Sequence, residues 1–338
     1  MSLLSVRDLQ VSFPTAGGTV HAVRGVSLEI QPGETVGLVG ESGCGKSTLG
    51  RAIMRLVPSA AGKIALNSRD LTLMSQHAMR PLRPLMGMIF QDPYGSINPR
   101  HSIGKTIGQP LALAGWDRVR IQDRVQELLC QVGLPATAAA RFPHEFSGGQ
   151  RQRIGIARAL ALHPKLLICD EPVSALDVSV RAQIINLLKD LQAELGVSYL
   201  FISHDLSVVQ HVCDRVLVMY LGRIVESGDT ATLWSRSAHP YTRALLGSAP
   251  TADPRARHGQ RQGILQGELP SPLNPPPGCA FSTRCPRAQE RCRQEQPVLR
   301  KLPDGQQVAC HFDLHGHPAT PVGHVGAAAN APALAALA

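Results

Sequence analysis

The 338-residue chain contains no run of eighteen or more apolar residues, although a helix needs about that length to cross a membrane. Its first ten residues alternate charged and apolar side chains, so they also lack the apolar core of a secretory signal peptide. These absences predict a soluble, cytoplasmic chain that is able to dock on a membrane protein. Hydrophobic residues still make up 43% of the sequence, which indicates a globular protein of two or three lobes.

No block of Lys and Arg concentrates the positive charge of the chain. The net charge is +9, from 34 Lys and Arg against 25 Asp and Glu, and it is spread along the sequence. Nucleic-acid arms carry dense basic blocks, so we expect no nucleic-acid partner. The chain also lacks an Asn-Lys-x-Asp motif, which reads guanine in GTPases, and a GTPase switch is therefore a weak interpretation.

A glycine-rich stretch at residues 40–48 matches the phosphate-binding pattern G-x-x-x-x-G-K-[ST]. An apolar run at 35–39 precedes it and a helical pattern at 49–56 follows, which favours a phosphate loop over an ordinary glycine-rich turn. The lysine would reach the β- and γ-phosphates of a nucleotide, and the serine hydroxyl would ligate Mg²⁺. The predicted loop consists of Gly40, Glu41, Ser42, Gly43, Cys44, Gly45, Lys46, Ser47 and Thr48. Cys44 sits near a helix N-terminus, a position that lowers the pKa of a thiol.

Two residues outside this loop have open interpretations. Phe13 lies at the tip of a predicted hairpin of strands 3–12 and 20–30, either as a core residue or as a platform on which adenine stacks. Gln91 ends a short strand region, either as part of a polar turn or as an amide that meets a metal ion or water. The helical period of residues 101–134 predicts a helical insertion after it.

A second anion site is predicted where Ser147, Gly148, Gly149 and Gln150 precede an apolar helical pattern. Serine is a natural N-cap, and two glycines leave bare N–H groups at the positive end of the helix. A simple helix start is the alternative, but adjacent glycines weaken a helix without an evident structural gain.

Carboxylates follow an unbroken apolar run at residues 166–169. Asp170 and Glu171 would lie at the carboxyl edge of a central parallel strand, where binding sites form. We expect Asp170 in the Mg²⁺ shell and Glu171 polarising the attacking water. A further buried strand at 197–202 delivers His204 to the same edge, where it would contact the γ-phosphate.

After residue 240 the sequence becomes rich in Pro and Arg, and four cysteines gather there. Five, six and seventeen residues separate Cys279, Cys285, Cys292 and Cys310. Four thiolates suit a zinc ion or an iron–sulfur cluster, and the absence of a C-x-x-C pair argues against a zinc ribbon. A bound metal would organise this region, and the tail at 316–338 is predicted to be disordered.

Together these motifs resemble the nucleotide-binding subunit of ATP-binding-cassette (ABC) transporters over residues 3–240. Five motifs occur in the family's order, namely the phosphate loop, Gln91, Ser147 to Gln150, Asp170-Glu171, and His204. Phe146 stands where the family usually has Leu. The resemblance implies an α/β, RecA-like P-loop NTPase domain at 1–240, with an antiparallel β subdomain and a helical subdomain at about 92–160. It also strengthens the adenine-stacking role of Phe13.

Three further stretches narrow the resemblance to the dipeptide and oligopeptide importer branch. They lie at residues 92–100, 239–242 and 267–274, beside the cysteines of a small Cys-rich region at 241–315. The closest match is with second ATPase subunits of bacterial dipeptide permeases. In that branch the four cysteines are associated with a 4Fe-4S cluster, which we therefore prefer to zinc.

The resemblance also implies partners and roles. Two ATPase subunits, expected to be different chains, pair head to tail so that ATP on one phosphate loop meets Ser147 and Gly149 of the other. In this arrangement Lys46 neutralises phosphate charge, Gln91 joins Asp170 in the metal and water shell, Glu171 is the general base, and His204 steadies the γ-phosphate. Asp177 communicates across the pair.

Membrane partners follow from the same resemblance. Two permease subunits would dock near Gln91, with an extracytoplasmic binding protein acting indirectly, at the cytoplasmic face of the bacterial inner membrane. Nickel chelates or glutathione are alternatives to peptides as the cargo. A soluble cassette ATPase of translation or DNA repair is the main rival, but the chain has neither a second cassette nor a long coiled-coil insertion.

Overall fold

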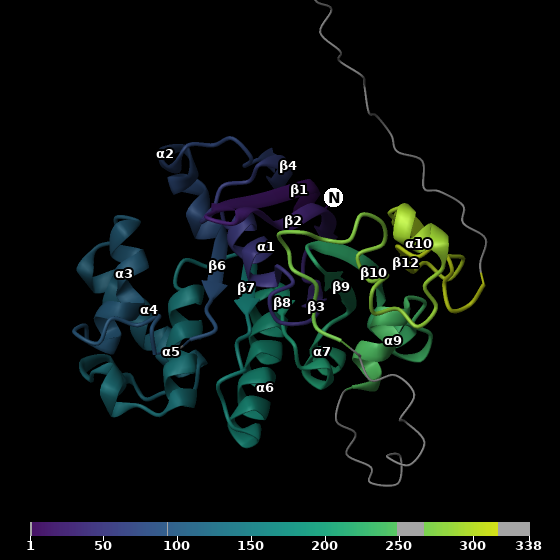
Figure 1. Ribbon diagram of the computed structural model, residues 1–338. Coiled ribbons are helices and arrows are strands. Elements are labelled where there is room, and N and C mark those ends of the chain that lie inside the picture. The colour runs from purple at the N-terminus through teal and green to yellow at the C-terminus, as the bar shows by residue number, and fades with distance from the viewer. Residues whose placement is uncertain (1, 93, 249–266, 317–338) are drawn as a thin grey trace, which may run out of the picture.

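The computed structural model describes residues 2–92, 94–248 and 267–316 (Figure 1). Two sheets organise this part of the chain. A four-stranded antiparallel sheet has the order β2-β1-β4-β5, and an eight-stranded sheet has the order β11-β12-β10-β9-β3-β8-β7-β6. The predicted disordered tail lies outside the described residues except for Gly316.

The antiparallel sheet forms because the hairpin predicted near the N-terminus extends over most of the first thirty residues. Its strands β1 (Leu4–Thr15) and β2 (Gly18–Ile30) pair from Leu4 opposite Ile30 to Thr15 opposite Gly18. Strands β4 (Ala61–Leu66) and β5 (Arg69–Asp70) continue the sheet. After β5 the chain forms α2 (Gln76–Met79) and a 3-10 helix (Arg80–Leu85).

The centre of the larger sheet is parallel and buried. Its strands β3 (Thr35–Val39), β7 (Leu166–Asp170) and β8 (Ser198–Ile202) are buried at every residue, as is β6 (Met86–Ile89). Nearly continuous apolar runs of this kind are typical of parallel strands covered on both faces. The remaining strands are β9 (Arg215–Tyr220), β10 (Arg223–Asp229), β11 (Arg300–Lys301) and β12 (Gln307–Val308).

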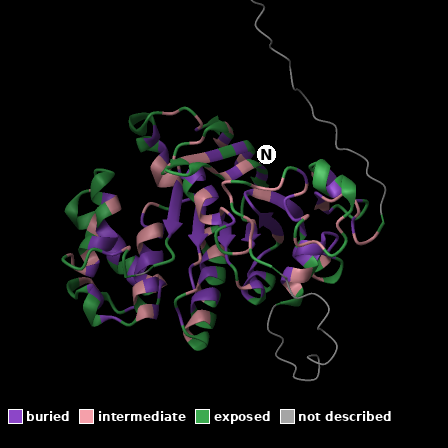
Figure 2. Ribbon diagram, in the orientation of Figure 1, coloured by how far each residue is buried: buried purple, intermediate pink, exposed green. Residues whose placement is uncertain are grey.

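Alternate residues of the parallel strands enter two different cores, because successive side chains of a strand point to opposite faces. Leu38 and Ile168 pack in one core with the antiparallel sheet and α1 (Lys46–Ile53). Leu167 and Phe201 pack in the other. Figure 2 shows the buried strands between these covering elements. The second core includes α6 (Val178–Leu195), α7 (Leu206–Val212) and α8 (Thr230–Ser235).

Three helices form a group on one side of the molecule in Figure 1, within the interval where an insertion is predicted. They are α3 (Ile103–Leu113), α4 (Arg118–Gln131) and α5 (Gly148–Leu160), and short 3-10 turns lie at Ala136–Ala140 and Pro143–Glu145. Ser102 and Asp117 cap the first two helices by accepting hydrogen bonds from N–H groups of the first turn. The apolar faces of all three helices belong to the second core.

The residues after 240 join the main sheet. Strand β12 pairs with β10, where Glu226 faces Val308, and β11 pairs with β12. The described residues of this part form α9 (Pro240–Gly247) and α10 (Glu290–Gln294), and Phe281 lies in the second core. A buried ion pair joins Arg300 to Asp313. The region thus uses the same core as the parallel sheet.

Within the described ranges, no helix combines the length and apolar character that crossing a membrane requires.

Candidate nucleotide site

The phosphate loop connects the buried strand β3 to helix α1, as predicted. Gly40 has φ +153°, and a Cβ added there would lie 2.2 Å from the carbonyl oxygen of Met219, so the loop passes too close to the end of β9 for any side chain. Gly45 precedes α1 in a left-handed conformation and offers no side-chain cap, which leaves the N–H groups of the first helical turn available to an anion.

Lys46 is bound within the loop itself. Its ammonium donates hydrogen bonds to the carbonyl oxygens of Gly40 at 2.7 Å and Glu41 at 2.8 Å. Cys44 lies 3.9 Å from the same nitrogen and is buried. Burial raises the pKa of this thiol, with the charge of Lys46 opposing, so the expected lowering by the helix terminus is wrong. Cys44 is a packing residue in the described structure.

Ser47 and Asp170, two of the three predicted magnesium ligands, lie together. The Ser47 hydroxyl donates a 2.7 Å hydrogen bond to Oδ1 of Asp170 at the end of β7. Asp170 is 1% exposed. Burial raises the pKa of its carboxyl group, while the hydrogen bond from Ser47 and the charge of Arg51 oppose this rise. A buried carboxylate beside a hydroxyl offers oxygen ligands of the kind that Mg²⁺ prefers.

The next three predicted residues form one hydrogen-bonded group around Glu171. Gln91 Nε2 donates to Oε2 of Glu171 at 2.9 Å, and His204 Nδ1 lies 3.2 Å from Oε1. Glu171 has φ +49°, a left-handed conformation that is uncommon for a residue other than glycine. This backbone turns the carboxylate away from the line of β7 toward the ends of β6 and β8. Both carboxylate oxygens thus have a partner.

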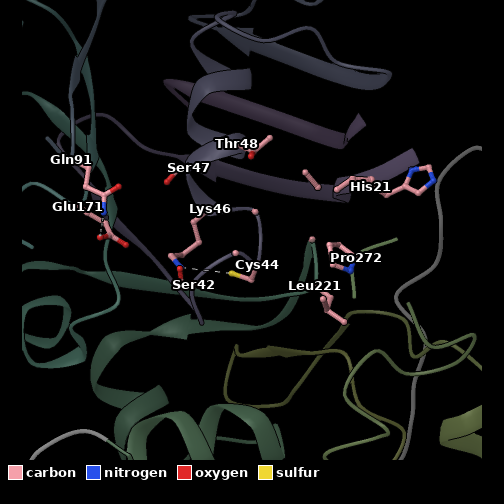
Figure 3. Close-up of a pocket in the computed structure, with 15 residues that line it drawn as sticks. His21, Ser42, Cys44, Lys46, Ser47, Thr48, Gln91, Glu171, Leu221 and Pro272 are labelled. Carbon is pink, nitrogen blue, oxygen red and sulfur yellow. Dashed lines mark hydrogen bonds between the residues drawn. The ribbon is translucent and has the colours of Figure 1, made fainter. Parts of the chain in front are cut away.

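A cavity of about 210 Å³ joins the loop to this group (Figure 3). Part of its wall is the loop from Ser42 to Thr48, and Gln91 and Glu171 lie at one end. Val20, His21 and Ala22 of β2 line it, as do Leu221 and Gly222 of the β9–β10 turn and Pro272 from the C-terminal region. Sequence reasoning missed these lining residues, because nothing local marks them as neighbours of the loop.

Phe13, the predicted adenine platform, is not among the residues that line this cavity. It pairs with Val20 across the hairpin and packs, partly buried, against the first core. Val20 and His21 line the wall at that place instead.

The glycine pair at the start of α5 forms a capped helix end away from this cavity. Ser147 Oγ accepts from the N–H of Gln150 at 3.3 Å, and the Gln150 side chain accepts from the N–H of Ser147 at 3.0 Å. Close packing requires a glycine at position 149, because a Cβ there would lie 2.3 Å from Cγ1 of Val180. Sequence reasoning missed this structural role. Asp177 caps α6 by accepting from the N–H of Val180 at 2.9 Å, and this hydrogen bond lowers the pKa of its carboxyl group. None of these residues lines the cavity around Lys46.

The four clustered cysteines line one small cavity, together with His239, Phe281 and His311. Burial raises the pKa of Cys279 to about 11 and that of Cys310 to about 12, and neighbouring thiols add to both shifts. Among the residues that the structure describes, no three His, Cys, Asp or Glu side chains are close enough to hold one metal ion. The donor set is present around a common space, but the thiols do not converge on a single point.

Three features define an ATP-binding cassette. They are a phosphate loop after the parallel strand β3, two carboxylates at the end of β7, and a capped glycine pair at the start of the inserted helix α5. ATP is the nucleotide that this class binds, in general with Mg²⁺, and its activity is ATP hydrolysis.

Comparisons with known proteins agree with this class. Residues 23–174 match the family model for ABC transporters, and residues 225–292 match that for the C-terminal region of oligopeptide/dipeptide transporters. The oligopeptide transport ATP-binding protein OppF of Salmonella typhimurium is 51% identical over 88% of this chain and 92% of its own. The putative oligopeptide transport ATP-binding protein YkfD of Bacillus subtilis is 49% identical over 92% of this chain and 96% of its own.

A solved structure extends the comparison to three dimensions. The dimeric, post-hydrolysis structure of the ATP-binding cassette MJ0796 with ADP and Pi has a TM-score of 0.62 and 26% identity, covering 67% of this chain and 98% of that one. The chain belongs to the peptide-transport family of ABC transporter ATP-binding proteins, which confirms the resemblance seen in the sequence.

Proposed function

We propose that this chain hydrolyses ATP to drive the uptake of peptides, with the chemistry placed at the cavity between the phosphate loop and Glu171. Glu171 acts as the general base, and His204 and Gln91 position it and the attacking water. The observation that carries this proposal is that Gln91 and His204 hold the two oxygens of one carboxylate, at 2.9 and 3.2 Å. An oriented carboxylate at the edge of a nucleotide cavity suits proton abstraction from water.

The phosphate-binding roles fall to the loop and its helix. Lys46 has its ammonium at the centre of the loop, where it would exchange carbonyl partners for phosphate oxygens. Ser47, Asp170 and Gln91 would hold Mg²⁺, whose charge supplies electrostatic stabilisation of the phosphates. The paired hydroxyl and carboxylate of Ser47 and Asp170 support this assignment.

A second ATPase subunit, which we expect to be a different chain, would complete the site. Ser147 and Gly149 lie at a capped helix end outside the cavity, so they would serve the nucleotide of a neighbour rather than this chain's own. The dimeric form of the MJ0796 cassette supports a paired arrangement. Asp177, exposed at the start of α6, would face the partner.

Two permease subunits would dock on the helical subdomain, which places the chain at the cytoplasmic face of the bacterial inner membrane. This subdomain carries exposed apolar side chains that a docked permease would cover. Tyr94 is 60% exposed and Leu113 is 83% exposed. We assign residues 1–240 to the ATPase domain and 241–315 to the C-terminal region, as the resemblance to peptide importers implies. An extracytoplasmic binding protein would deliver the cargo to the permeases.

The cysteine cavity would hold a 4Fe-4S cluster. The proposal rests on four cysteine side chains that line one cavity, and on the importer resemblance, in which these four positions are associated with such a cluster. Its contribution would be structural, because it ties together segments of little regular structure.

Peptides are the proposed cargo because both relatives named above are oligopeptide transport proteins. The test is affinity purification of the tagged chain from detergent-solubilised membranes, with mass spectrometry of the chains recovered. We expect two multi-span permeases and a second cassette ATPase. Recovery of ribosomes or repair factors would contradict the transport role, and a nickel- or glutathione-binding protein encoded with the recovered chains would replace peptides as the cargo.

A further inference from the structure

Hydrogen bonds hold Glu41, the second residue of the phosphate loop, at its N–H, its carbonyl oxygen and its carboxylate. Its N–H donates to the hydroxyl of Tyr241 at 3.0 Å, and its carbonyl oxygen accepts from Lys46 at 2.8 Å. Its carboxylate oxygens lie 2.8 and 3.0 Å from one nitrogen of Arg284. Two of these three partners come from the region after residue 240.

Arg284 reaches the loop from 243 positions further along the chain. Its side chain is 5% exposed and that of Glu41 is 25% exposed, so this ion pair is shielded from water far more than a surface pair. Arg284 also lies 3.4 Å from the hydroxyl of Tyr220, with its guanidinium 5.9 Å from that ring. Burial alone would lower the pKa of Arg284, but the hydrogen bonds to Glu41 and Tyr220 outweigh it and raise the pKa.

The segment that carries Arg284 also lines the thiol cavity. Cys285 directly follows Arg284, and Phe281 lies three residues before Arg284; both line that cavity. The centroid of the Phe281 ring lies 5.4 Å from the ring centroids of both Tyr220 and Tyr241. The centroids of the two tyrosine rings are 4.7 Å apart. A continuous packed path therefore runs from the cysteines to the backbone N–H of Glu41.

We propose that Arg284 is a positioning residue of the nucleotide site, which neutralises Glu41 and thereby makes ATP affinity depend on the C-terminal region. Glu41 places a carboxylate in a loop whose ligand is a triphosphate. With Arg284 present, the carboxylate is drawn toward the C-terminal region and its charge is compensated. Without Arg284, the phosphate loop carries an uncompensated anion, and its repulsion of the triphosphate weakens nucleotide binding.

The experiment measures the Kd of a fluorescent ATP analogue on the purified full-length chain. We expect Arg284→Gln to raise the Kd about tenfold, as a coupling of this kind typically does. Glu41→Gln keeps the shape of the side chain without its charge, and its Kd is the reference for the double variant. The double variant, Arg284→Gln with Glu41→Gln, should bind like Glu41→Gln alone, because the carboxylate that Arg284 compensates is then absent. Arg284→Lys should restore most of the affinity.

The control is Arg291→Gln, which breaks an ion pair with Glu295 at 2.8 Å in the same region, on exposed side chains. Its Kd should equal that of the wild type. A double variant that binds as weakly as Arg284→Gln would overturn the proposal, since a general loss of structure is not cured by removing a charge. An unchanged Kd in Arg284→Gln would overturn it as well.

A second variant covers the case in which Arg284→Gln does not fold. Arg284→Met, which keeps an apolar stem without the charge, is then compared with Arg284→Met combined with Glu41→Gln, and recovery of affinity in the double variant is expected. This inference rests on the proposed nucleotide site, and the wild-type Kd tests that site separately. If the wild type fails to bind the analogue, the nucleotide site is wrong; if it binds and the variants do not differ, only the role of Arg284 is wrong.

Discussion

Ser47 and Asp170 are 123 residues apart in the sequence, yet their side chains are joined by a 2.7 Å hydrogen bond. Ser47 lies in the first turn of α1, which follows β3, and Asp170 is the last residue of β7. Strand β8 pairs in parallel with both β3 and β7, so the ends of these two strands lie near each other. The sheet thus brings the metal-binding oxygens together. What remains to be measured is what each neighbouring group contributes.

Glu171→Gln should slow ATP hydrolysis by about 10²–10⁴-fold, because the amide cannot accept the proton of the attacking water. Nucleotide binding should persist, since the phosphate loop is untouched. Steady-state hydrolysis in the reconstituted transporter gives the first quantity, and binding of a fluorescent ATP analogue gives the second. Glu194→Gln, on the exposed face of α6, is the matched control. Near-normal turnover in Glu171→Gln would exclude Glu171 as the base.

Ser147→Ala should reduce turnover of the assembled transporter while leaving nucleotide binding by the isolated chain unchanged. Removal of the N-cap should also lower the free energy of unfolding by about 1 kcal/mol. Ser102→Ala is a close control, because Ser102 caps α3 with the same geometry. Both variants should lose similar stability in urea titrations, and only the first should lose turnover. Equal turnover in the two variants would leave Ser147 as a simple cap.

Cys285→Ser should remove the brown colour and the visible absorption that a 4Fe-4S cluster gives to protein purified without oxygen. The cluster needs four thiolates, and Cys285 lines the shared cavity. Cys130→Ser is the control, since this exposed cysteine lies on α4 in the helical group. Metal analysis should find iron in the wild type; zinc without iron would refute the cluster.

The buried carboxyl of Glu226 should give the fold a pH dependence of its own. Burial raises its pKa to about 7 from 4.5, although the nearby Thr242 hydroxyl and the hydrogen bonds donated by the backbone N–H groups of Ala238 and His239 oppose the shift. The folded state therefore binds more protons than the unfolded state between these two values, and the contribution of Glu226 to stability falls as pH rises through this window. Full ionisation costs about 3 kcal/mol at most.

Glu226→Gln isolates this effect, because the difference in unfolding free energy between wild type and variant removes the other titrations. We expect that difference to favour the wild type at low pH and to decline between about pH 4.5 and 7. Urea unfolding at a series of pH values measures it. A difference that is constant with pH would mean that Glu226 is already ionised, and stabilised by its two backbone donors, in the folded protein.

Phe13 and His21 offer a direct test of which side chain contacts the adenine. Only His21 lines the cavity in the described structure. If the family's stacking arrangement applies, Phe13→Ala should weaken ATP binding by about 1 kcal/mol and His21→Ala should have less effect. Competition binding with ATP and with triphosphate alone measures the contribution of the base. The reverse order would make β2 the base-binding wall.

Sequence patterns could predict those parts of the fold and site where neighbours along the chain determine the geometry. The phosphate loop between strand and helix depends on residues within a few positions. The carboxylates at Asp170 and Glu171 were predictable because parallel strands end at a common edge. The cap at Ser147 followed from residue type alone.

Contacts across long separations were beyond sequence reasoning. Arg284 has no local pattern that points to Glu41, and Pro272 carries none that points to the nucleotide cavity. Burial was equally hidden, since Cys44 precedes a helix but is enclosed, which reverses the expected direction of its pKa shift. The stretch at residues 239–242 contributed to the family resemblance, but the sequence did not show that the Tyr241 hydroxyl accepts a hydrogen bond from the phosphate loop.

The pairing of β12 with β10 has a consequence for how the chain can be divided. A protein that stopped at residue 240 would leave the backbone N–H and C=O groups of β10 without their neighbour, along a strand that is buried from Ile224 to Gly228. A strand with an unpaired edge is a template for association between molecules. The isolated ATPase domain would therefore tend to aggregate, whereas in the whole chain β12 pairs with this strand within one molecule.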